Sequence, residues 1–288
     1  MRKTFVANSA ALVIIIIIAT GCSARADAQT TAAAKAIGSS TAKGGFKNED
    51  EIREKFNNWR TDADAQDWLR TMNYSPSAID SVTATKPHGE KADVEVKIKA
   101  KNGEKTEGIS IKLVSSPNGF NQIDKRWLSH YAKMWKIPTD AENALKLFVG
   151  ELPPAKSGRA GNRMFLDELD TDSQKAVISF FETHKADIVS DLFQGDGMHA
   201  AGWVMVAFKA TQNTRWALKK VDEAIKFYSE GPVVITSGGN LKIGRITMQR
   251  KGGDAGRDTA KMLQFKINPT LLITNGGLRL CSGGANCL

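Results

Sequence analysis

The chain has 288 residues, of which 41% are hydrophobic and 25% charged, a balance typical of globular proteins and unlike disordered, collagen-like or coiled-coil chains. It contains 40 lysines and arginines against 31 aspartates and glutamates, which gives a net charge of +9. This excess favours a polyanionic partner, either a nucleic acid or an anionic membrane surface. Three cysteines and four scattered histidines show no zinc-binding spacing, which disfavours zinc enzymes and histidine-centred nucleases.

The two ends of the chain differ from its middle. Residues 1–22 combine Arg2 and Lys3 with an apolar run that ends at Cys22, the pattern of an export signal with a bacterial lipoprotein cleavage site. The alternative is an upstream extension or an incorrectly assigned start. Residues 23–43 are predicted to form a flexible tether, and the glycine-rich tail 273–288 is predicted to be disordered. The folded domain is expected to span residues 44–272.

Helical spacing predicts helices at residues 48–59 and 62–72, and Ser75-Pro76 is expected to open a short third helix. Residues 92–100 then alternate between apolar and charged side chains, which predicts a strand. A second strand at 109–114 follows Asn102-Gly103, a strong hairpin signal. Further helices are expected at 122–135, 141–148, 173–192 and 215–228, and further strands at 203–208, 233–236, 243–249 and 262–267. The mixture predicts a single α/β domain with a mixed sheet and flanking helices.

The hairpin gathers charged side chains that could carry chemistry. A two-residue turn at Asn102-Gly103 pairs residues whose numbers sum to 205, so Asp93 is expected opposite Lys112 and Glu95 opposite Ser110. Phosphodiester hydrolysis needs carboxylates that hold a hard cation such as magnesium and a lysine that orients or deprotonates water. Acids and lysines along one strand face are more often a solvated face with ion pairs, so the pattern alone leaves both interpretations open.

Five segments, in order along the chain, carry a family resemblance. They are TAKGGFKNE at 41–49, KLVS with GFNQIDK within 112–125, GELPP at 150–154, QRKGGD at 249–254 and MLQFKI at 262–267. Together they resemble the HinP-type type II restriction endonucleases, which cut the tetranucleotide GCGC and have the PD-(D/E)XK nuclease fold. The similarity runs from about Thr41 to Pro269, and it implies a restriction-endonuclease-like mixed sheet and Mg²⁺-dependent hydrolysis of double-stranded DNA at GCGC.

The resemblance also implies roles for the hairpin residues. Asp93 corresponds to the central metal ligand and Lys112 to the catalytic lysine. Glu49, on the first predicted helix, would add a carboxylate to the metal site, and Ile111 would offer its backbone carbonyl.

Ser110 is the departure from the family pattern. It takes the position of the second motif residue, where the family has what looks like a glutamine, and its shorter side chain reaches less far. We hypothesise that Glu95, expected to be its cross-strand neighbour, supplies the missing oxygen to the metal. Ala92, before the aspartate, also departs from the general nuclease motif.

The segment after the catalytic strand is implied to read or distort the target, with Phe120, Asn121, Gln122 and Lys125 as DNA contacts. Lysine and side-chain amides pair with base edges, and an aromatic ring can wedge between base steps. For Phe120, core packing is the alternative.

The C-terminal part of the domain is strongly basic. Residues 201–270 contain 12 lysines and arginines against 5 acids, and basic residues beside glycines suit an approach to phosphates. Arg250, Lys251 and Lys266 are therefore expected to contact phosphates or base edges. Gln249 and Asp254 are further base-contacting or positioning candidates, although a glycine-rich hairpin turn would show a similar pattern.

These expectations describe a restriction endonuclease that works in the cytoplasm beside a cognate methyltransferase, which acts on the same site. A palindromic target admits either a homodimer or two successive nicks by a monomer. Three alternatives remain open: a repair or structure-specific nuclease of the same fold, a DNA-binding protein whose catalytic site has decayed, and an exported lipoprotein nuclease or envelope protein.

Overall fold

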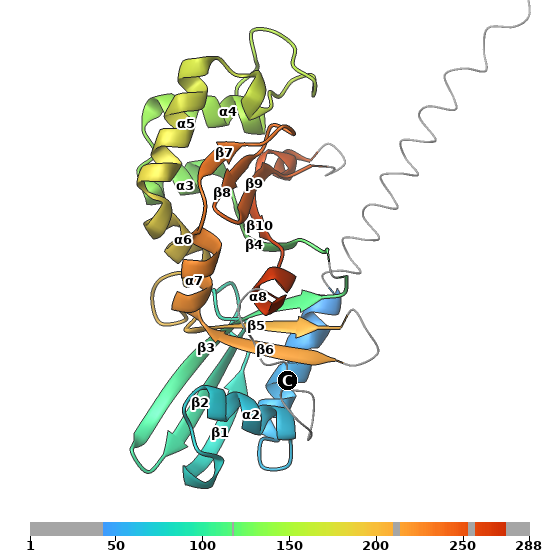
Figure 1. Ribbon diagram of the computed structural model, residues 1–288, viewed down its shortest axis with the longest axis vertical. Coiled ribbons are helices and arrows are strands. Elements are labelled where there is room, and N and C mark those ends of the chain that lie inside the picture. The colour runs from blue at the N-terminus through green and yellow to red at the C-terminus, as the bar shows by residue number, and fades with distance from the viewer. Residues whose placement is uncertain (1–42, 117, 210–213, 253–256, 275–288) are drawn as a thin grey trace, which may run out of the picture.

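The computed structural model describes residues 43–116, 118–209, 214–252 and 257–274. The predicted signal segment, nearly all of the predicted tether, Asp254 and the three cysteines lie outside these ranges. Within them, two five-stranded sheets follow one another along the long axis of the molecule, with helices along one side (Figure 1). No helix among the described residues is long and apolar enough to cross a membrane.

The first sheet is mixed. Its strand order is β1 (Ile79–Thr85), β2 (Val94–Ala100), β3 (Gly103–Val114), β5 (Trp203–Phe208) and β6 (Arg215–Lys220). Only β3 and β5 run parallel, and the other neighbours are antiparallel. β5 is an almost unbroken apolar run because both of its faces are covered: Val204 and Val206 pack in one core cluster, and Met205 and Ala207 pack in the other.

The second sheet is antiparallel throughout. Its order is β4 (Asn121–Arg126), β10 (Leu263–Ile267), β9 (Ile246–Arg250), β8 (Leu241–Ile243) and β7 (Val233–Ile235). β4 is an edge strand that follows directly on the segment after β3, so the chain passes from the first sheet into the second at this point. Strands that are distant in sequence thereby share one surface.

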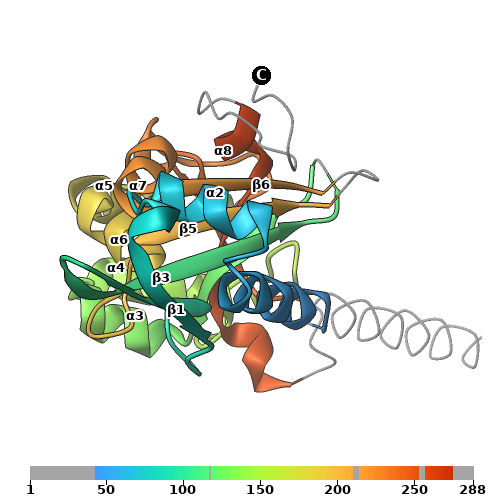
Figure 2. The same ribbon diagram turned by 90° about the horizontal axis from the view of Figure 1, so that it is seen from below.

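Helices cover both sheets. Residues 43–57 are helical and, with α2 (Ala63–Thr71), pack on one face of the first sheet (Figure 2). The larger core cluster contains residues of the second sheet, of the other face of the first sheet and of the remaining helices. These are α3 (Leu128–Trp135), α4 (Thr139–Val149), α5 (Thr171–Thr183), α6 (Lys185–Phe193), α7 (Val221–Ser229) and α8 (Thr270–Thr274), with short 3₁₀ turns at Pro76–Ala78, Leu166–Glu168 and Asp258–Lys261.

The predicted N-terminal helices are present. Ile52 and Phe56, expected on one helical stripe, are fully buried, and Trp59 continues the stripe just after the helical residues. Asp62 caps α2 by accepting a hydrogen bond from the N–H of Ala65 at 2.9 Å. The apolar spacing and the cap thus explain why these segments fold as helices.

The predicted register of the hairpin is wrong by two residues. Ala100 pairs with Gly103 and Val94 pairs with Ile109, so paired numbers sum to 203 and the turn residues are Lys101 and Asn102. Gly103 has a φ of +124° and stands as the first residue of β3 rather than within the turn. A shift of two preserves which side chains share a face, because the side-chain period of a strand is two.

Several secondary-structure predictions are corrected as well. Residues 121–126 and 215–220 form strands where helices were expected, because β4 pairs with β10 and β6 pairs with β5. Pairing with a neighbouring strand outweighs a short helical pattern. β1 was not expected, and the helix predicted at 173–192 is divided at His184 into α5 and α6.

Gly108 on β3 has no room for a side chain. A Cβ added there lies 2.3 Å from the carbonyl oxygen of Ala200, which belongs to the loop packed against the hairpin. We predict that Gly108→Ala lowers the free energy of unfolding by about 1–3 kcal/mol, measured by urea denaturation. Gly45→Ala is the matched control, because nothing lies within 4 Å of its added Cβ and alanine favours a helix by about 0.5–1 kcal/mol. Equal stability of both variants would contradict the packing argument.

Candidate active site

The start of β2 and the end of β3 bring Asp93 and Lys112 together. The N–H of Asp93 donates to the carbonyl of Ile109 at 2.9 Å, which extends the pairing of the two strands. One carboxylate oxygen, Oδ2, accepts from the N–H of Ile111 at 2.6 Å and lies 3.7 Å from Nζ of Lys112. The two side chains that the sequence placed face to face are therefore neighbours, although the register differs.

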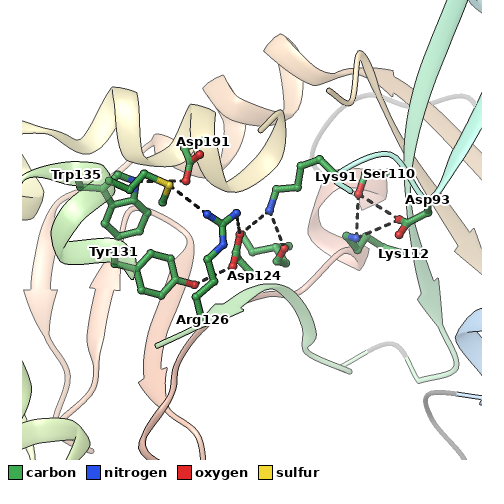
Figure 3. A network of polar contacts seen from close by, with 11 residues as sticks. Lys91, Asp93, Ser110, Lys112, Asp124, Arg126, Tyr131, Trp135 and Asp191 are labelled. Carbon is green, nitrogen blue, oxygen red and sulfur yellow. Dashed lines mark hydrogen bonds and ion pairs between the residues drawn. The ribbon is translucent and has the colours of Figure 1, made fainter. Parts of the chain in front are cut away.

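Ser110 lies between these two charged groups. Its hydroxyl donates to Oδ2 of Asp93 at 3.4 Å and accepts from Nζ of Lys112 at 3.0 Å (Figure 3). Nζ of Lys112 also donates to the carbonyl of Ile111 at 3.1 Å. Two acceptors beside Asp93 thus orient the ammonium group, whose remaining proton can point towards a reactant.

The site lies in a polar hollow of ≈ 380 Å³ where the two sheets meet. The first sheet lines it with Asp93, Ser110 and Lys112, and β4 of the second sheet lines it with Asp124 and Arg126. The lining also includes Lys91, just before β2, and Gly195 and Asp196, after α6. The hollow therefore joins the hairpin that carries the predicted catalytic residues to the segment that was expected to read DNA.

Glu49 reaches the same environment from the N-terminal helix. Burial raises the pKa of its carboxyl, and its hydrogen bond with Lys86, 3.0 Å away, opposes the increase. The charge of Asp93 raises the same pKa further, whereas that of Lys112 lowers it. Glu49 therefore interacts electrostatically with both members of the central pair, as expected for a carboxylate close to them.

The oxygen atoms gathered here suit a hard cation. Those of the central pair are the carboxylate of Asp93, the hydroxyl of Ser110 and the carbonyl of Ile111, and the carboxylate of Glu49 interacts with them electrostatically. Mg²⁺ prefers oxygen ligands and binds through one or two carboxylates while keeping several waters. No group of three or more histidine, cysteine, aspartate and glutamate side chains with metal-site geometry occurs among the described residues.

Glu95 does not lie next to Ser110, contrary to our hypothesis. It pairs with Gly108 across the hairpin, because of the shifted register, and its Oε1 lies 2.6 Å from Nδ1 of His199. The hydrogen bond to Glu95 raises the pKa of His199. The geometry therefore gives Glu95 a partner in the loop after α6 and offers no support for its predicted contact with the metal.

A second group of charges borders the hollow and was missed from the sequence. Lys91 donates to Asp124 at 2.8 Å, and Asp124 also accepts from Arg126 at 3.0 Å and from the hydroxyl of Tyr131 at 2.8 Å (Figure 3). Burial raises the pKa of Asp124, but the two cations outweigh it and the net direction is downward. Burial lowers the pKa of Lys91, and the charges of Lys112 and Arg126 lower it further. The carboxylate of Asp124 raises it, but the net direction is downward.

The predicted DNA-reading residues come together on neighbouring strands. Gln122 on β4 pairs with Lys266 on β10, and Lys125 pairs with Gln264, which in turn pairs with Gln249 on β9. Directly paired residues share a face of the sheet, so side chains from three distant segments form one polar surface, in which Gln264 is buried and Gln122 is exposed. Phe120, whose side chain is exposed, immediately precedes this strand, whereas Asn121, the first residue of β4, pairs with the buried Ile267 and therefore lies on the opposite face of the sheet from Gln122.

Arg250 is the exception among these candidates. It is buried, and its guanidinium donates to the carbonyls of Phe148 and Met164 at 3.1 and 3.0 Å and stacks over the ring of Phe165. Burial, with the nearby charge of Arg163, lowers its pKa to about 10. Both of these hydrogen bonds are donated by Nη1 inside the molecule, so the geometry gives Arg250 an internal role and does not support the predicted contact with DNA.

Two comparisons with known proteins bear on this geometry. A solved chain, restriction endonuclease MspI in complex with its cognate DNA, matches with a TM-score of 0.54 at 12% identity, covering 76% of this chain and 87% of that chain. At this identity the likeness establishes the fold. The family model for the R.HinP1I restriction endonuclease matches residues 72–273. The chain belongs to the R.HinP1I restriction endonuclease family. A search of curated proteins finds no match.

Membership of the R.HinP1I family makes the protein a type II restriction endonuclease with a mixed α/β fold. The matched range includes the hairpin with Asp93 and Lys112, the segment on β4 that is predicted to read DNA, and the strands β9 and β10. Glu49 lies before it, so its role is inferred from its electrostatic contact with Asp93 and Lys112 alone.

The contact between Glu95 and His199 allows a test of where Glu95 acts. We predict that the pKa of His199, followed by NMR titration, lies above its usual value of 6.5 and falls towards it in Glu95→Gln. The pair stabilises the folded chain at low pH, and this contribution is lost as the pH rises through the raised pKa.

Glu90→Gln is the matched control, because Glu90 raises the pKa of His199 less than Glu95 does. Saturating Mg²⁺ is expected to leave the His199 titration unchanged. A fall in its pKa on adding Mg²⁺ would instead mean that Glu95 is drawn to the metal.

Proposed function

We propose that this endonuclease hydrolyses double-stranded DNA at GCGC in a reaction that requires Mg²⁺. The observation that carries the proposal is the placement of Asp93 and Lys112, 3.7 Å apart, in a polar hollow that borders β4. A phosphodiester in this hollow would lie beside a carboxylate, a lysine and the base-reading strand. The neighbour MspI was solved with its cognate DNA, which supports duplex DNA as the substrate here.

Asp93 and Glu49 would hold the Mg²⁺ through carboxylate oxygens, with the carbonyl of Ile111 as a further ligand. The N–H of Ile111 holds one oxygen of Asp93 at 2.6 Å, which fixes the direction of that carboxylate. A bound Mg²⁺ would supply positive charge against the charge that develops on the phosphoryl oxygens.

Lys112 would orient the attacking water or accept its proton. Ser110 and the Ile111 carbonyl fix two of the three ammonium donors, so the third has a defined direction. This orientation is the contribution of Ser110 in the second motif position: it places the lysine and leaves most metal binding to the two carboxylates.

Target reading is assigned to the polar surface of β4, β10 and β9. Gln122 and Lys125 would pair with base edges, and Lys266 and Gln249 would contact bases or phosphates from the neighbouring strands. Exposed Phe120, next to Asn121 at the start of β4, would wedge between base steps. Lys251, with the amide of Gly252, would contact the phosphate backbone.

The remaining assignments follow from the chemistry of restriction. The enzyme would act in the cytoplasm on unmodified DNA, while a cognate methyltransferase modifies the same site without needing to bind it. A palindromic target requires either a homodimer or two successive nicks by one monomer.

We predict that the purified protein cuts unmethylated plasmid into defined fragments whose sequenced ends lie in GCGC, and only when Mg²⁺ is present. Asp93→Asn and Lys112→Ala are each expected to reduce the cleavage rate roughly 100-fold or more, with DNA binding retained. Lys97→Ala is the control: Lys97 lies on the same face of β2 but pairs with exposed Glu104, so its rate should match the wild type. Nicks that follow DNA structure rather than sequence would point instead to a repair nuclease.

Substitution of Lys251 should weaken DNA binding, whereas substitution of its neighbour Arg250 should lower the stability of the fold. Lys251→Ala is expected to weaken binding to all duplexes and to reduce the salt slope of the binding constant by about 1. Arg250→Met is expected to leave that slope unchanged and to lower the free energy of unfolding by about 2 kcal/mol, through lost internal hydrogen bonds. Gel-shift titrations over a salt series and urea denaturation measure the two effects. A reduced salt slope in Arg250→Met would contradict the internal role.

A further inference from the structure

One ion pair joins the catalytic strands to the reading strand. Lys91 stands two residues before Asp93, and Asp124 lies within β4 of the other sheet. Nζ of Lys91 donates to Oδ2 of Asp124 at 2.8 Å and to the carbonyl of Ile123 at 3.1 Å. The two side chains are only 14% and 5% exposed, so the contact is shielded from water and from salt.

The pairing of β4 with β10 explains why Asp124 and its neighbours point to opposite sides. Asp124 pairs with Phe265, a core residue, whereas Gln122 and Lys125 pair with the polar residues Lys266 and Gln264. The register shifts at this point, and Ile123 has no partner on β10 within the described residues. Lys91 donates to the carbonyl of this bulged residue as well as to Asp124, so the same side chain contacts both the bulge and the ion-pair partner. A β-bulge changes the direction of the side chains beside it.

The surroundings of Lys91 are closely fitted to its side chain. Gly195, with a φ of +67°, lies so near that an added Cβ would be 2.6 Å from Cγ of Lys91. Arg126 donates to the same oxygen of Asp124 as Lys91 does, Oδ2, and the hydroxyl of Tyr131 donates to the other oxygen, Oδ1. Both side chains are therefore held by several contacts at once, and through them the segment leading into Asp93 is attached to β4.

We propose that Lys91 and Asp124 form a positioning pair that couples target reading on β4 to the catalytic pair Asp93 and Lys112. The inference rests on the proposed function, since it needs β4 to contact the target. When the correct bases dock against Gln122 and Lys125, the ion pair transmits the resulting position of β4 to Asp93. Displacement of a reacting group by about 1 Å can cost roughly 100-fold in rate, so this link affects which sites are cut.

The test compares two single-turnover cleavage rates, one for the cognate tetranucleotide and one for a site with one base pair changed. The cognate tetranucleotide is identified from the sequenced ends of wild-type digests. The ratio of the two rates does not depend on how much of the enzyme is folded, so a purely structural loss leaves it unchanged. We expect Lys91→Met to reduce the ratio by roughly tenfold or more, because the cognate rate falls while the near-cognate rate does not. Lys91→Arg, which retains the charge, should recover part of it.

Lys185→Met is the matched control. Lys185 also donates to one carboxylate, that of Glu182 at 2.6 Å, and to one backbone carbonyl, that of Gly231 at 2.9 Å, but it lies at the start of α6 away from the lining of the hollow. Its loss should leave the ratio at the wild-type value. If Lys91→Met does not fold, Lys91→Gln, which keeps a donor for Ile123, is measured in the same way.

The outcomes separate the two proposals. A wild type that cuts no duplex in Mg²⁺ overturns the proposed function and this inference with it. A wild type that cuts, with an unchanged ratio in the Lys91 variant, overturns the coupling and leaves the nuclease assignment intact. The ratio is also measured in Lys91→Met, in Asp124→Asn and in the double variant. If the double variant lowers the ratio no further than either single variant does, the two residues act as a pair.

Discussion

The antiparallel pairing of β2 with β3 is the constraint on which the rest of the site depends. It brings the beginning of one strand next to the end of the other, so that Asp93 and Lys112, 19 positions apart in the chain, lie within 3.7 Å. The backbone completes the arrangement, because the N–H of Ile111 binds the carboxylate of Asp93 directly. Strand pairing is far stiffer than a loop, so the relative position of the two groups is fixed before any substrate arrives.

Charge balance in the hollow follows from the meeting of two sheets. Lys112 and Asp93 come from the first sheet, while Asp124 and Arg126 come from the second, and Lys91 links the two groups. A lone buried charge is unstable in a protein interior, so each needs a partner of opposite sign. The ion pair of Lys91 with Asp124, between the two sheets, offsets part of this positive charge. Lys91, Lys112 and Arg126 can therefore lie close together beside the place where a phosphate would bind.

The sequence was sufficient for features that depend on periodicity. Alternation along β2 assigned Asp93 and Glu95 to one face, and the slip of two residues left that assignment unchanged while it gave Glu95 a different partner. Features that depend on long-range packing were not predictable in this way. Arg250 resembles a DNA-contacting residue in a basic turn, and only the carbonyls of Phe148 and Met164, some hundred positions away, show that it is internal. The contact of Lys91 with Asp124, 33 positions away on another sheet, leaves no local pattern either.

Ser110 shows what a departure from a motif changes in the geometry of a site. A longer side chain at this position could extend to a metal, whereas the serine hydroxyl stays beside the strand, where it donates to Asp93 and accepts from Lys112. A hydroxyl can do both at once, because it carries one donor and two acceptor lone pairs. A carboxylate could only accept, so it would not donate to Asp93 and would add a second negative charge beside it. Compared with the glutamine of the family pattern, serine gives up reach, but its hydroxyl still orients the ammonium group of Lys112 through a hydrogen bond of 3.0 Å.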